Sequence, residues 1–170
     1  MNRKLIKKVG IIIVAIIVAF VTKQYFDNKE ETRKEEQALG KREKIFAAMV
    51  SEDNTALQYF KNEYPERKVI LACEEDITND ERKDLLVIYE ENSHTRVVAL
   101  CDNGKGSYYF SPEIPAPVEN QTIQFKNIDK EAEIEFIISG EKKGAVGYAI
   151  YRMIDGEIKD LFGDGMEDCC

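Results

Sequence analysis

The sequence predicts an α+β fold in which an N-terminal membrane segment and helices precede an antiparallel β-rich domain built from a duplicated β unit. Three observations support this prediction. A basic and then apolar segment opens the chain, apolar residues recur at helical spacing between Ile45 and Tyr64, and short β-rich runs separated by turn residues follow from Val69 onward. The 170 residues suffice for one modest domain and leave no room for a second large one.

Residues 1–26 are predicted to be a signal anchor or a signal peptide. Basic residues at positions 3, 4, 7 and 8 precede an uncharged run over 9–22, made mainly of Ile, Val, Ala and Phe. This run is shorter than the roughly 20 residues that span a bilayer, which leaves both a cleaved peptide and a tilted anchor open. Because basic flanks stay in the cytoplasm, we expect a single-pass membrane protein with an extracytoplasmic domain, or a secreted domain after cleavage.

The charge of the chain is unevenly distributed. The formal net charge is -8, but residues 1–26 hold five of the 24 basic residues and no acidic ones. The remaining residues therefore carry 19 basic and 32 acidic side chains, a net charge of -13. A domain this acidic repels phosphate backbones, so nucleic acid is not an expected partner.

Two helices are predicted ahead of the β-rich region, after a charged helical spacer over 27–44. Apolar residues at Ile45, Phe46, Met49 and Val50 indicate the first helix of the α+β domain, which is assigned to 45–162. The second contains Leu57, Phe60 and Tyr64, begins after a capping region at 51–54 and ends at Pro65. Both helices are expected to pack against the sheet.

Eight strands are predicted from β-rich runs bounded by turn residues. They are Val69–Cys73, Leu85–Tyr89, Thr95–Cys101, Ser107–Phe110, Thr122–Phe125, Ile134–Ser139, Val146–Ile154 and Glu157–Phe162. Asn103-Gly104 and Asp155-Gly156 stand between such runs and supply the positive φ angles of two-residue hairpin turns. The sheet is therefore expected to be antiparallel.

The β-rich region aligns with itself as two copies of one unit, over about 70–110 and 122–162. Asp76-Ile77 aligns with Asn127-Ile128, and Asp84 aligns with Glu135. After one added residue, the two predicted hairpin turns also coincide. The joint over 111–121 contains three prolines, which block the hydrogen bonds of a sheet.

The residues that support catalysis are few. His94 is the only histidine and lies in a polar loop, without a recognisable nucleophile or a glycine-rich phosphate loop. Carboxylates are abundant but scattered over an acidic surface. The sequence therefore predicts a protein without enzymatic activity and without a required cofactor.

One loop has the spacing of a calcium site. Asp76, Thr78, Asp80 and Asp84 occupy relative positions 1, 3, 5 and 9, where oxygen ligands wrap a hard cation. The loop resembles the Asp-rich loops of integrin-like β repeats over about nine residues, but Glu81 replaces the glycine of the sharp turn. The alternative is a polar turn that leads into the buried strand Leu85–Tyr89.

The four cysteines form two groups. Cys73 and Cys101 lie in apolar strands, where buried thiols, a disulfide and a ligand role all remain open. Cys169 and Cys170 end an acidic segment over 163–170 that is expected to be flexible. Adjacent thiols on such a segment can hold one soft metal ion, with Met166 as a weaker donor. Neighbouring acids oppose thiolate formation, so capture would release protons.

Four segments resemble a known family. They are Asp84–Tyr89 (DLLVIY), Pro115–Asn120 (PAPVEN), Gly144–Tyr151 (GAVGYAIY) and Asp160–Cys170 (DLFGDGMEDCC). From Val69 to the end, the chain is similar to the Cys-Cys-COOH (seleno)proteins called SaoC. The resemblance implies a selenocysteine-assisted organometal transport system, with mercury or organomercury as cargo and membrane transporter or permease components as partners.

Some members of that family carry selenocysteine in the terminal pair, whereas both positions are Cys here. The resemblance therefore implies the sulfur version, with Cys169 and Cys170 as the ligands of the cargo. Two other functions stay open. One is a thiol-disulfide redox protein that uses a vicinal disulfide, and the other is a non-catalytic structural adaptor that uses the β domain alone.

Overall fold

The computed structural model describes residues 22–24, 29–30, 34, 45–130 and 133–170. The chain divides into two units, Met1–Lys44 and Ile45–Cys170. The described residues of the first unit are helical, and Lys34 Nζ lies 2.9 Å from Glu30 Oε1 one turn away. Most of the predicted membrane segment and spacer lies outside the described residues. Within the described part, no helix is both long and apolar enough to cross a membrane.

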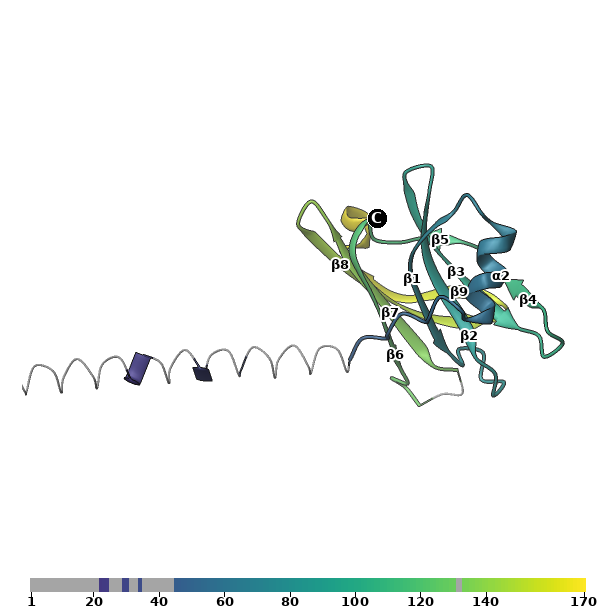
Figure 1. Ribbon diagram of the computed structural model, residues 1–170, viewed down its shortest axis with the longest axis horizontal. Helices are drawn as coiled ribbons and strands as arrows, with labels where there is room; N and C mark the ends of the chain where they lie inside the picture. The colour runs from purple at the N-terminus through teal and green to yellow at the C-terminus, as the bar shows by residue number, and fades with distance from the viewer. Residues whose placement is uncertain (1–21, 25–28, 31–33, 35–44, 131–132) are drawn as a thin grey trace, which may run out of the picture. The chain divides into compact units, whose positions relative to one another are not determined.

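The second unit is mainly β and contains two antiparallel sheets (Figure 1). The first has the order β1-β2-β3-β4, with β5 also paired to β3, and the second has the order β6-β7-β8-β9. The first sheet comprises β1 (Lys68–Glu75), β2 (Asp84–Glu91), β3 (His94–Asp102), β4 (Tyr108–Phe110) and β5 (Ile114–Pro115). The second comprises β6 (Glu119–Lys126), β7 (Glu135–Lys142), β8 (Ala145–Ile154) and β9 (Glu157–Asp164). The predicted antiparallel, β-rich character is confirmed.

The second predicted helix is present as α2 (Thr55–Glu63). Asn54 caps it, because its side-chain oxygen accepts a hydrogen bond of 3.0 Å from the backbone N–H of Leu57. Leu57 and Phe60 are fully buried on one face of the helix, against the outer face of the first sheet. Pro65 follows directly after the capping residue Tyr64, as expected.

The first predicted helix is wrong, because residues 45–50 are not helical and instead form an edge strap along the two sheets. The backbone N–H of Ala47 donates to the carbonyl of Ile123 in β6 at 2.8 Å, and that of Val50 donates to the carbonyl of Ala72 in β1 at 2.9 Å. Both strands are sheet edges, whose unpaired carbonyls offer partners that a helix would leave unused. The apolar side chains of this segment are thus not a helical face.

Two hydrophobic clusters divide the interior. One lies between the sheets and contains Leu86, Ile88, Phe136 and Ile138 among others, while the second lies between the first sheet and α2. The first sheet is consequently covered on both faces. The outer face of the second sheet is more exposed, and Val146 and Phe162 keep 70% and 53% of their surface accessible.

Strands β1 to β4 of the first sheet correspond in order to strands β6 to β9 of the second. β6 begins at Glu119, 51 residues after β1 begins at Lys68, and β7 begins at Glu135, 51 residues after β2 begins at Asp84. Positive φ angles also recur 51 residues apart, with 55° at Asn79 and 66° at Lys130. The strands of 70–110 thus lie in the first sheet and those of 122–162 in the second.

Equivalent residues of the two sheets face in opposite directions relative to the core. Leu86 lies between the sheets, whereas its neighbours Leu85 and Val87 contact the cluster beneath α2. In the second sheet, the residue that corresponds to Leu85 is Phe136, and it lies between the sheets. The next residue, Ile137, corresponds to Leu86 and therefore lies on the outer face, because successive side chains of a strand point to opposite faces. The two sheets therefore face each other through non-equivalent faces, an arrangement that we call same-sense stacking.

One of the two predicted hairpin turns is confirmed. Asp155 and Gly156 have φ angles of 53° and 78° and join the paired residues Ile154 and Glu157. The other is wrong, because β3 ends at Asp102 and β4 begins only at Tyr108, which leaves a loop of 103–107. Asp102 Oδ1 accepts the backbone N–H of Gly104 at 2.7 Å and so stabilises this wider loop.

Candidate thiol site

The end of the chain is folded, which corrects the prediction of a flexible segment over 163–170. β9 continues through Asp164 and is followed by the four-residue α3 (Met166–Cys169). This helix lies against β8 and β7 (Figure 1, yellow). Glycines and acidic residues are typical of mobile segments, so the contacts that hold this segment could not be predicted from residue type.

Gly165 allows the close approach of α3 to β8. Its φ angle is 66°, a left-handed conformation that other residues seldom adopt. A Cβ atom at this position would lie 2.6 Å from the carbonyl oxygen of Val146 and 3.2 Å from the Cα atom of Gly147. A side chain here would therefore force α3 away from the sheet.

Two sulfur atoms meet on one side of α3. Met166 packs against the core between the sheets, and the thiol of Cys170 donates a weak hydrogen bond of 4.0 Å to Met166 Sδ. Two sulfur ligands each about 2.3 Å from one metal ion can lie up to about 4.6 Å apart, so the observed separation is within reach of a single ion. The backbone of Cys169 belongs to α3, and its side chain lies outside what the structure describes.

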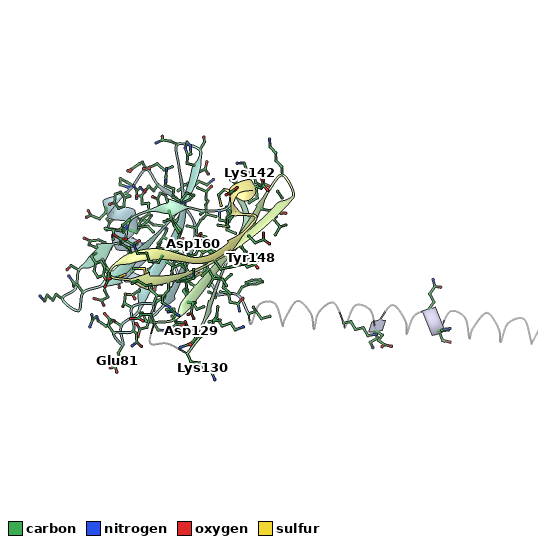
Figure 2. All side chains as sticks on the ribbon, turned by 180° about the vertical axis from the view of Figure 1, so that it is seen from behind. Glu81, Asp129, Lys130, Lys142, Tyr148 and Asp160 are labelled. Atoms are coloured by element: carbon green, nitrogen blue, oxygen red, sulfur yellow. The ribbon has the colours of Figure 1, made fainter. Side chains whose placement is uncertain are left out.

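Lys142 contributes a positive charge that the sequence did not predict. It is the last residue of β7, and its Nζ atom donates a hydrogen bond of 3.0 Å to the main-chain oxygen of Cys170, 28 residues later. Figure 2 shows Lys142 at the end of the domain where α3 lies. No local motif indicates such a contact, because it depends on how the strands are paired.

In the loop that resembles a calcium site, the carboxylate oxygen atoms accept hydrogen bonds from the protein itself. Asp84 Oδ2 accepts the backbone N–H groups of Ile77 and Thr78 at 3.2 and 3.1 Å and the Thr78 hydroxyl at 2.9 Å. Asp84 Oδ1 accepts the backbone N–H of Asp102 at 3.1 Å. Burial raises the pKa of Asp84, and its hydrogen bonds from Thr78, Asp102 and Ile77 partly oppose that rise.

The other acids of the loop are engaged in the same way. Asp76 accepts the backbone N–H groups of Asp80 and Glu81 at 3.1 and 2.9 Å, while Asp80 accepts the backbone N–H of Arg82 and pairs with its guanidinium group. Glu81 itself takes a positive φ of 65°, so the sharp turn forms without glycine. These contacts favour the polar turn over the calcium site.

The second sheet repeats this arrangement. Glu135, the counterpart of Asp84, accepts the backbone N–H of Ile128 at 2.7 Å and pairs with Arg152, which also pairs with Asp129. Figure 2 places Glu81, Asp129 and Lys130 at the end of the domain opposite Lys142, so both loops lie away from α3. Among the described side chains, which exclude that of Cys169, no three His, Cys, Asp or Glu groups gather as a metal site.

Cys73 and Cys101 are fully buried free thiols in the core between the sheets. Burial raises the pKa of each thiol to about 12, so both stay protonated at neutral pH. Cys73 also donates a weak hydrogen bond of 3.7 Å to the carbonyl of Ala47 in the edge strap. The sequence left buried thiols, a disulfide and a ligand role open for these two residues, and the structure shows buried free thiols.

Known proteins provide no further guide to the site. No family model, curated protein or solved structure matches the chain. The single histidine is exposed at the start of β3, with Nδ1 2.9 Å from the carbonyl of Asn92. The residues around α3 therefore carry the functional inference.

Proposed function

We propose that the protein captures a thiophilic metal ion or organometal through Cys169 and Cys170 and passes it to membrane transporter components. The observation that carries this proposal is the approach of Cys170 Sγ to Met166 Sδ at 4.0 Å on a docked helix. Thiolate and thioether ligands select soft metal ions, and Cys169 adds a second thiol next to the first. The protein acts as a carrier and needs no catalytic group.

The resemblance to SaoC proteins supports mercury or organomercury as the cargo. The basic and apolar segment over 1–26 supports a membrane-tethered protein with its β domain on the extracytoplasmic side. In this arrangement the thiols receive the cargo outside the membrane and hand it to a permease.

The chemistry of capture and transfer is ligand exchange at sulfur. When mercuric ion binds, two S–H bonds break, two S–Hg bonds form and two protons pass to solvent. A thiolate of the acceptor then forms a new S–Hg bond while one bond to the carrier breaks, and a second exchange completes the transfer. No oxidation or reduction takes place in these steps.

The proposal is tested by titrating the reduced full-length protein in detergent with mercuric chloride and with methylmercury chloride. Native mass spectrometry is expected to show tight binding by the wild type and its loss in the double variant Cys169→Ser/Cys170→Ser. The variant Cys73→Ala serves as the matched control, because its thiol is buried and should not bind. Unchanged affinity in the double variant would refute capture by this pair.

A further inference from the structure

We propose that the outer face of the second sheet is the contact surface between two copies of this chain, which pair around a two-fold axis. The central row of this face consists of Ile137, Ile150 and Phe162, which are paired side by side across β7, β8 and β9. The inference goes beyond metal capture, because it rests on the strands of the second sheet and on no residue of the thiol site.

Large apolar side chains of this face remain open to solvent. The exposed fraction is 70% for Val146, 53% for Phe162 and 38% for Tyr148. The ring centroids of Tyr148 and Phe162 lie 5.9 Å apart, so the two side chains form one aromatic pair. Among residues 45–130 and 133–170, no helix or strand covers these side chains, since α3 contacts β8 from the core side through Met166. A contiguous exposed apolar surface of this kind marks an interaction site.

The first sheet shows what covers the corresponding face there. Leu86 is paired with Ala99, and Ile137 and Ile150, each 51 positions later, are paired in the same way. Leu86 and Ala99 lie in the core between the sheets, so their face is covered by another sheet. The opposite face of the first sheet is covered by α2. Three of the four sheet faces are therefore covered within the chain, and the outer face of the second sheet is the fourth.

A second copy has only the same face to offer. Two of its sheet faces are taken up by the contact between its own sheets, and a third lies under α2. The contact is therefore isologous, with the same residues on both chains, and it closes as a dimer instead of extending into a filament. The resulting stack contains four sheets with an α2 helix at each end, and every sheet face in it is covered.

The charges on β9 are complementary to those of a second copy. Lys159 and Asp164 lie on this face on either side of Phe162, because they are paired with Arg152 and Tyr148, outer residues of β8. Stacked sheets commonly keep their strands within about 30° of each other. With a two-fold axis across the strands at the central row, β9 of one copy lies antiparallel over β9 of the other. Asp164 of each copy then faces Lys159 of the other, and this complementarity favours a second copy over an unrelated protein.

The affinity has to come mainly from the apolar centre. Lys159 already pairs with Glu157, but both side chains are about half exposed, and such a pair contributes little and can exchange. The net charge of -13 on residues 27–170 opposes association, and physiological salt screens much of this repulsion. The two intermolecular charge pairs therefore fix the orientation of the copies more than they add to the affinity.

The test measures the mass of the full-length protein in detergent by light scattering, over a range of concentrations and under reducing conditions that exclude disulfides. Wild-type protein is expected to be a dimer. Phe162→Asp should be monomeric at the same concentrations, because it places a charge at the apolar centre. Ile128→Asp is the matched control and should stay dimeric, since Ile128 is also exposed, at 45%, but lies in the loop after β6.

Charge reversal tests the orientation of the two copies. Lys159→Glu and Asp164→Lys should each raise the dissociation constant of the dimer about five- to thirtyfold, since each replaces two attractive pairs by two repulsive ones. The double variant Lys159→Glu/Asp164→Lys exchanges the two charges and should restore the wild-type constant. Lys105→Glu is the matched control, because it makes the same change in net charge at an exposed loop residue of the first sheet.

Monomeric wild-type protein would overturn the proposal. So would dimers that persist in Phe162→Asp, because the copies would then meet elsewhere on the chain, and so would an equal loss in Ile128→Asp. If the double charge variant remains as weak as the single variants, or if Lys105→Glu weakens the dimer as much as Lys159→Glu, the two-fold arrangement is wrong. Mercuric ion is absent from all of these measurements, so their outcome is independent of the proposed capture.

Discussion

Burial of the Cys73 thiol makes the free energy of unfolding depend on pH. It is fully buried, and desolvation raises its pKa from the ordinary 9.0 to about 12. Below pH 9.0 the thiol keeps its proton in both the folded and the unfolded chain, so it adds no pH dependence. Between these two values the unfolded chain loses the proton first, and rising pH therefore favours unfolding.

The variant Cys73→Ala should test this effect. At neutral pH its free energy of unfolding is expected to be about 1 kcal/mol lower than that of the wild type, because one buried group is lost. Toward pH 11 the difference should shrink and then reverse, since the variant no longer carries the thiol that ionises on unfolding. Urea unfolding at several pH values measures it, and a difference that stays constant with pH would contradict the explanation.

The residues of the thiol site were only partly predictable from the sequence. Cys169, Cys170 and Met166 were identified because their sulfur chemistry can be read from residue type alone. Lys142 was not, because its contact with Cys170 is a hydrogen bond between residues 28 positions apart. For Asp84 the sequence left both a calcium ligand and a polar turn open, since its partners are mainly backbone N–H groups, which every residue except proline has.

Among the elements, α3 depends on a single glycine for its position. Gly165→Ala is expected to displace α3 from β8, because a Cβ atom would lie 2.6 Å from the carbonyl oxygen of Val146. Hydrogen exchange of the α3 amides should become faster, while the rest of the domain keeps its protection.

Gly163→Ala is the matched control for this variant. A Cβ atom at Gly163 would come no closer than 3.5 Å to the Cβ atom of Ala149, an ordinary contact. Exchange at α3 should then resemble that of the wild type. Equal effects of the two substitutions would show that Gly165 has no particular role.

The elements differ in how well their sequences define them. All eight predicted strands form, because alternating or continuous apolar runs bounded by turn residues are strong local signals. The edge strap over 45–50 was mistaken for a helix, since its apolar residues also fit helical spacing while its partners are carbonyls of β1 and β6. β5 was missed because it is two residues long and lies in the proline-rich joint.

At the scale of the whole molecule, the stacking of the two sheets predicts unequal effects of substitutions at corresponding strand positions. Leu86→Ala is expected to lower the free energy of unfolding by about 2–5 kcal/mol, because Leu86 is fully buried between the sheets. Ile137→Ala, 51 positions later, should cost less because its side chain lies on the outer face of the second sheet. Urea unfolding compares the two, and equal losses would contradict the same-sense stacking of the sheets.

The edge strap determines how the domain responds to mechanical tension. A pull on the chain at residue 45 first loads the hydrogen bond between Ala47 and Ile123, and the bond between Val50 and Ala72 carries load only after the first has broken. In a protein tethered as proposed, rupture at Ala47 lengthens the linker by a few residues before β1 is strained. The strap thus absorbs small displacements of the tether while both sheets stay folded.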